Sequence, residues 1–112
     1  MSIQDTIKTQ IEKNKVMLYM KGSPDFPQCG FSAHTVDILK SYGFPFDSED
    51  VLADPVVRDG IKRYSNWPTI PQLYVKGEFI GGCDIVREMF QSGELVTHLN
   101  ANGIAATMPQ KG

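Results

Sequence analysis

The chain has 112 residues, 41% of them hydrophobic, and its 11 basic and 13 acidic side chains leave a formal net charge of −2. This length suits one domain with a single core, and the composition is that of a folded globular protein rather than a disordered one. We expect no nucleic-acid or membrane partner, because such binding needs an excess of Lys and Arg on one surface.

The first residues carry no targeting signal. Residues 1–13 lack a basic segment followed by an apolar run, and they include Asp5 and Glu12, which transit peptides usually avoid. No apolar run approaches the roughly 18 residues that a transmembrane helix needs. The sequence therefore predicts a cytoplasmic protein.

The N-terminal part of the chain predicts a helix followed by a buried strand. Ile3, Ile7 and Ile11 recur every fourth residue between polar residues, which indicates an amphipathic surface helix over residues 2–13. The apolar run over 16–20 has no polar alternation, as is typical of a strand covered on both faces. This strand should lie in the centre of a sheet.

A loop, a helix and a second strand come next. Residues 22–28 are rich in turn-forming residues and can continue neither regular structure. The apolar spacing predicts a helix from about Phe31 to Tyr42, closed by Gly43, and a second strand over 46–51. Cys29 therefore stands at the start of a helix.

The second half of the chain predicts a third helix and a hairpin. Pro55 suits the first turn of a helix that runs to about Tyr64. Residues 72–75 and 78–80 are separated by a two-residue turn and should pair as an antiparallel hairpin.

Two short helices should complete the domain. Asp84 is a suitable N-cap for a helix over 85–91, and another helix follows over 94–100. The order of elements predicts an α/β fold with a mixed four-stranded sheet and helices on both faces. The domain should span residues 1–102, and residues 103–112, which have little apolar content, should form a flexible tail.

The two cysteines cannot form the disulfide framework of a small secreted scaffold, so their value is chemical or lies in packing. A free Cys taken alone is most often a small buried hydrophobe. Cys29, however, has the N–H groups of a helix start beside it, which stabilise a thiolate and lower its pKa. Gly30 leaves room at the sulfur, and Lys21 adds positive charge nearby. These features favour a nucleophile or a metal ligand.

The site is monothiol, because the position of a second cysteine in a Cys-x-x-Cys motif is Ser32. Four motifs then resemble a single family. They are Cys29-Gly30-Phe31-Ser32, Lys21-Gly22-Ser23-Pro24, Trp67-Pro68-Thr69-Ile70-Pro71 and Gly81-Gly82-Cys83-Asp84. In this order, and over roughly Ile3 to Leu99, the chain resembles the monothiol glutaredoxins of the CGFS type.

The resemblance implies a thioredoxin-like fold in which Pro71 follows a cis peptide bond and faces Cys29. It also implies a groove for glutathione, whose two carboxylates suit cationic side chains and the N–H groups of a helix start. The residues implied to line this groove are Lys21, Arg58, Thr69, Ile70, Cys83 and Asp84, with Lys62 as a weaker candidate.

Two functions are compatible with these residues. In the first, the protein carries a [2Fe-2S] cluster, which needs four ligands that are usually thiolates. Cys29 of two chains and two glutathione thiols would complete the set in a homodimer, and the resemblance adds BolA-like proteins and apo iron–sulfur proteins as partners. In the second, Cys29 takes the glutathionyl group from a mixed disulfide as a glutathione-dependent oxidoreductase. The resemblance implies weak reductase activity and ranks the carrier first.

The remaining residues have plainer interpretations. An inert buried Cys29 would leave its place at a helix start without a purpose. Trp67 should be structural, and His34 should face water. Cys83 should contact glutathione through its backbone, and a disulfide with Cys29 under oxidising conditions stays open.

Overall fold

The computed structural model describes residues 2–108, which form five helices and four strands in the order that the sequence predicts. The elements are α1 (Ile3–Lys13), β1 (Val16–Met20), α2 (Gly30–Ser41), β2 (Asp47–Asp50), α3 (Pro55–Ser65), β3 (Gln72–Val75), β4 (Glu78–Gly81), α4 (Cys83–Ser92) and α5 (Glu94–Ala101). None of the helices described is long and apolar enough to span a membrane.

The strands form one mixed sheet in the order β2-β1-β3-β4. β1 pairs in parallel with β2 and antiparallel with β3, and β3 pairs antiparallel with β4. Lys76 and Gly77 join β3 to β4 with φ values of 51° and 82°, as a two-residue hairpin turn of type I′ requires. The predicted α/β class is confirmed, and β1 lies inside the sheet.

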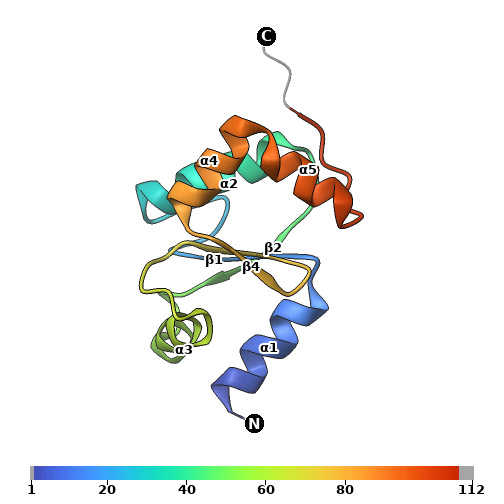
Figure 1. Ribbon diagram of the computed structural model, residues 1–112. Helices are drawn as coiled ribbons and strands as arrows, with labels where there is room; N and C mark the ends of the chain where they lie inside the picture. The colour runs from blue at the N-terminus through green and yellow to red at the C-terminus, as the bar shows by residue number, and fades with distance from the viewer. Residues whose placement is uncertain (1, 109–112) are drawn as a thin grey trace.

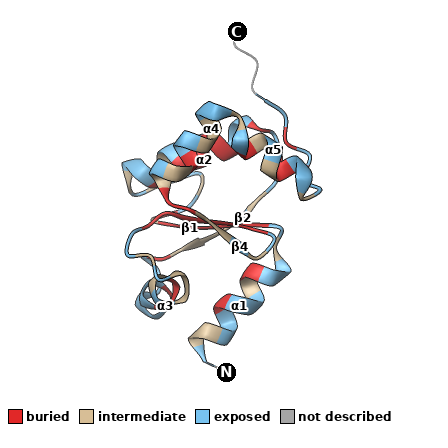
Figure 2. Cartoon of the chain, in the orientation of Figure 1, coloured by how far each residue is buried: buried red, intermediate tan, exposed pale blue. Residues whose placement is uncertain are grey.

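Helices cover both faces of the sheet (Figure 1). α2, α4 and α5 lie on one side, and α1 and α3 lie on the other. Successive side chains of a strand point to opposite faces, so Leu18 packs in the core with α2 and α4, whereas Tyr19 packs in the core with α1 and α3. All residues of β1 are buried (Figure 2), which explains its uninterrupted apolar sequence.

The parallel pair β1 and β2 positions the loops that matter for function. Loops that follow parallel strands leave the sheet at the same edge, and these two loops lead into α2 and α3. The N–H groups of Gly22 and Leu52 donate to the same carboxylate oxygen of Asp50, at 2.9 and 2.8 Å. The loop before Cys29 is thereby fixed to the loop before α3.

The start of α4 differs from the prediction. Gly82 is its N-cap, and Asp84, predicted as the cap, lies within the first turn, where its carboxylate pairs with Arg87 at 3.3 Å. An acidic residue is favourable both at an N-cap and in the first turn of a helix. The sequence signal was therefore displaced by two positions.

The end of the folded domain also differs from the prediction. Ile104 and Ala106 are buried in the core under α2 and α5, and the N–H of Thr107 donates to the carbonyl of Tyr42 at 3.1 Å. The domain thus extends beyond residue 102. Residues 109–112 of the predicted flexible tail lie outside the described residues.

Candidate active site

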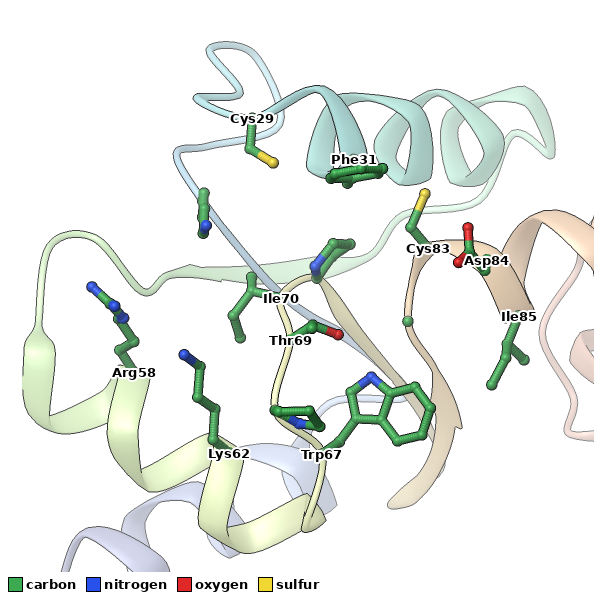
Figure 3. Close-up of a pocket in the computed structure, with 14 residues that line it drawn as sticks. Cys29, Phe31, Arg58, Lys62, Trp67, Thr69, Ile70, Cys83, Asp84 and Ile85 are labelled. Atoms are coloured by element: carbon green, nitrogen blue, oxygen red, sulfur yellow. The ribbon is translucent and has the colours of Figure 1, made fainter.

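A cavity of about 440 Å³ opens beside Cys29 (Figure 3). Its walls come from the starts of α2 and α4, from α3, and from the segment between α3 and β3. It is lined by Lys21, Cys29, Phe31, Arg58, Lys62, Trp67, Pro68, Thr69, Ile70, Pro71, Gly82, Cys83, Asp84 and Ile85. Every residue that the sequence analysis assigned to the site is in this set.

Cys29 is the N-cap of α2, and its half-exposed sulfur lies at the pocket. The structure holds the pKa of Cys29 below its ordinary value. The backbone N–H of Ser32 is the largest cause, and burial opposes it; the N–H of Phe31, the charge of Lys21 and the Ser32 hydroxyl lower the pKa further. The start of α2 thus stabilises a thiolate, as helix N-termini do for anions.

Ser32 has a role that the sequence analysis missed. The side chain is fully buried, and its oxygen accepts a 3.1 Å hydrogen bond from the N–H of Lys21. This bond joins the residue that follows β1 to the first turn of α2. It therefore fixes the position of Lys21 relative to Cys29 at the start of α2. The sequence marked Ser32 only as the absence of a second thiol, because no local pattern distinguishes a buried serine from an exposed one.

Positive charge gathers on the α3 side of the pocket. Arg58 and Lys62 lie one turn apart on α3, and both side chains extend towards the cavity in Figure 3. With Lys21 they provide three cations, and the pocket lining contains one carboxylate, that of Asp84. A concave site of this charge attracts anionic ligands such as carboxylates and phosphates.

The wall below the thiol is the segment 67–71. The peptide bond between Ile70 and Pro71 is cis, and both residues line the pocket with Cys29. Trp67 packs on Phe79 with ring centroids 5.7 Å apart and also faces the cavity, so it is both a packing residue and part of the wall.

Gly82 lies against this wall. A Cβ atom at that position would stand 3.2 Å from Trp67 Nε1 and 3.4 Å from the carbonyl of Pro71. A side chain there would therefore crowd the wall.

The start of α4 supplies the opposite side of the pocket. No side-chain hydrogen bond caps this helix, so its first N–H groups can receive an anion. Cys83 and Cys29 are both free and half-exposed, and they line the same cavity; a disulfide between them stays a prediction. His34 is exposed on α2 and is not part of the pocket lining, as expected.

The chain is similar to known proteins over most of its length. The Glutaredoxin family model matches residues 16–80. Glutaredoxin 4 of Pasteurella multocida is 51% identical over 111 residues, covering 99% of this chain and 100% of the relative. The uncharacterized monothiol glutaredoxin ycf64-like of Synechocystis is 60% identical over 85 residues, covering 76% and 79%. The solution structure of a monomeric truncated mutant of Trypanosoma brucei 1-C-Grx1 aligns with a TM-score of 0.85 at 43% identity, covering 95% and 96%.

Proposed function

The chain belongs to the glutaredoxin family, in its monothiol group, and we propose that it binds glutathione beside Cys29 and carries a [2Fe-2S] cluster shared by two copies of the chain. The observation that supports this most is the pairing of a stabilised thiolate with a cationic pocket. The cluster is the cargo of the protein, which it receives and passes on in the cytoplasm.

The pocket has the chemistry that a small acidic peptide needs. Glutathione has two carboxylates and an extended backbone. Lys21 and Arg58 would pair with one carboxylate, with Lys62 as the weaker contributor, and the N–H groups at Cys83 and Asp84 would receive the other. Thr69 and Ile70 would pair with the peptide backbone between them.

The cluster proposal follows from the number of ligands. A [2Fe-2S] cluster needs four, usually thiolates. Within residues 2–108 there is no group of three or more His, Cys, Asp or Glu side chains that could hold a metal ion, and Cys29 offers one thiolate at the pocket mouth. One chain is therefore insufficient, whereas two chains with two glutathione thiols complete the set. Half of these ligands exchange with solution, which favours transfer to apo iron–sulfur proteins or to a BolA-like partner.

A second function is favoured by the same thiolate. Cys29 would attack the glutathione sulfur of a mixed disulfide between glutathione and a target protein. A disulfide between Cys29 and glutathione forms, and the target protein leaves as a thiolate. A second glutathione thiolate would then attack that disulfide, releasing oxidised glutathione and regenerating Cys29. Ser32 cannot take the place of a resolving thiol, so the cycle depends on glutathione. We rank this activity second and expect it to be weak.

One experiment separates the two functions. The protein is purified anaerobically with glutathione, and its visible spectrum and mass in solution are recorded. A coloured dimer that becomes a colourless monomer on Cys29→Ser, but not on the matched Cys83→Ser, supports the carrier. A colourless monomer that rapidly reduces glutathionylated substrate would reverse the ranking.

A further inference from the structure

Gln72 is a buried polar residue directly behind the pocket wall and is not part of the pocket lining. It is the first residue of β3, and its side chain is fully buried. The amide nitrogen donates to the carbonyls of Trp67 and Thr69, at 3.1 and 3.2 Å. The amide oxygen accepts from the Tyr74 hydroxyl at 3.1 Å. Two of these three contacts join β3 to the segment 67–71, and the third holds the amide from within β3.

These bonds fix the direction of one peptide group. The carbonyl of Thr69 points inward to Gln72. In the segment 67–71 the cis peptide bond is the one between Ile70 and Pro71, and the bond between Thr69 and Ile70 is trans. In a trans peptide the N–H points opposite to the C=O. The N–H of Ile70 therefore points away from the core and towards the cavity.

That N–H is a free donor. Among the described residues, no hydrogen bond of the Ile70 N–H is present. Pro71 has no N–H to offer, so Ile70 carries the N–H that lies next to the cis bond. The cavity wall would lose this donor if the Thr69–Ile70 peptide group turned over.

We propose that Gln72 is a positioning residue: its amide holds the Thr69 and Trp67 carbonyls inward and so presents the Ile70 N–H to a carbonyl of the bound peptide. This proposal rests on glutathione being the ligand of the pocket. The Tyr74 hydroxyl holds the other end of the amide. Burial raises the pKa of Tyr74 to about 12, so this hydroxyl keeps its proton and remains a donor at physiological pH.

The test is an NMR titration of the full reduced chain with glutathione. Gln72→Met keeps the length of the side chain and removes the amide, and we expect glutathione to bind about 5- to 10-fold more weakly, as for the loss of one or two hydrogen bonds. The pKa of the Cys29 thiol, measured by alkylation rate against pH, should not change, because the groups that lower it lie in α2 and at Lys21. Tyr74→Phe keeps the amide and frees one end of it, so the affinity should fall less.

A matched control separates positioning from stability. Gln10 also joins a tyrosine hydroxyl to a second group, since it accepts from Tyr19 and donates to Glu49 at 3.2 Å, but it lies on α1 and is not part of the pocket lining. Gln10→Met should reduce stability and leave the affinity for glutathione unchanged. Equal losses of affinity in the Gln10 and Gln72 variants would overturn the proposal.

A second measurement needs no ligand. A neutral gadolinium chelate relaxes amide protons that face solvent, and the Ile70 amide should be relaxed strongly in the wild-type chain and less in Gln72→Met. Equal relaxation in the two would overturn the positioning role. If the wild-type chain did not bind glutathione, the proposed function would fail, and this measurement would still decide how Gln72 acts.

Discussion

The backbone N–H of Lys21 and the side-chain oxygen of Ser32 are joined by a 3.1 Å hydrogen bond. Lys21 follows β1, and Ser32 lies in the first turn of α2. The same Ser32 residue contributes its N–H and its hydroxyl to stabilising the Cys29 thiolate. One buried serine thus connects the sheet, the helix start and the reactive sulfur.

Ser32→Ala should weaken both the fold and the thiolate. The substitution leaves the Lys21 N–H without its partner in a partly buried place, which should lower the free energy of unfolding by about 1–3 kcal/mol. The pKa of Cys29 should rise only slightly, because the backbone N–H of residue 32 is the largest cause of its lowering and remains. Urea denaturation and the pH dependence of alkylation measure the two effects.

The control is Ser41→Ala, which removes a hydroxyl bonded to the Ile38 carbonyl in the last turn of α2. It should change the free energy of unfolding by about 0.5 kcal/mol or less. An equal loss in the two variants would contradict a special role for Ser32.

Lys21→Gln should make Cys29 less reactive near neutral pH. The positive charge lowers the pKa of Cys29, so its removal raises that pKa and decreases the thiolate fraction below the midpoint. The curve of alkylation rate against pH should move to higher pH, and the two proteins should react alike once both thiols are ionised. Added salt should reduce the difference, because it screens exposed charges.

Lys15→Gln is the matched control for this change. Lys15 precedes β1 and Lys21 follows it, so the length of the strand, about 3.3 Å per residue, separates the two charges. The alkylation curve of Lys15→Gln should coincide with that of the wild-type chain. A shift of similar size would mean that net charge, and not the position of Lys21, controls the thiol.

The order of elements could be predicted from the sequence, because the signals that indicate it are local. The apolar run of β1, the turn at Lys76 and Gly77 and the proline at the start of α3 are local signals, and each formed the element that it indicated. Arg58 and Lys62 were harder to assign to the pocket from the sequence, because two cations one turn apart usually mark a solvated helix face. Family resemblance placed them in the pocket, and the fold brings them there.

Features that depend on contacts distant in the sequence could not be predicted. Ile104 and Ala106 are two apolar residues in a polar segment, and only the packing surface of α2 and α5 makes them core. Gln72 resembles any polar residue that begins a strand. Its role depends on the carbonyls of Trp67 and Thr69, which become its partners only in the folded chain.

Gly22→Ala should destabilise the loop that leads to Cys29. Gly22 has a φ of 88°, and an added Cβ would stand 2.5 Å from the Phe26 carbonyl oxygen and 2.7 Å from the Gln28 nitrogen. Both neighbours are backbone atoms and cannot rotate away. We expect a loss of roughly 3 kcal/mol or more in the free energy of unfolding.

Gly77→Ala isolates the conformational part of that loss. Gly77 has a φ of 82°, and an added Cβ there meets nothing within 4 Å. Its substitution should cost only the strain of the left-handed backbone, about 1–2 kcal/mol. Thermal or urea denaturation of the two variants should differ clearly; equal losses would show that the loop around Gly22 yields to a side chain.

Arg58→Gln should weaken glutathione binding more than any other single removal of charge on α3. The Arg58 guanidinium can form two parallel hydrogen bonds with one carboxylate, whereas the Lys62 ammonium acts as a point charge. Arg58 is exposed to solvent, so screening limits the effect to roughly 3- to 10-fold in affinity. Lys62→Gln should reduce the affinity less than Arg58→Gln does.

Arg63→Gln is the control. Arg63 follows Lys62 on the same helix but lies outside the pocket lining, so its substitution removes the same charge and should leave the affinity unchanged. Titrations at low and high salt measure these losses, and an equal effect of Arg58→Gln and Arg63→Gln would show that the helix attracts the ligand only through its overall charge.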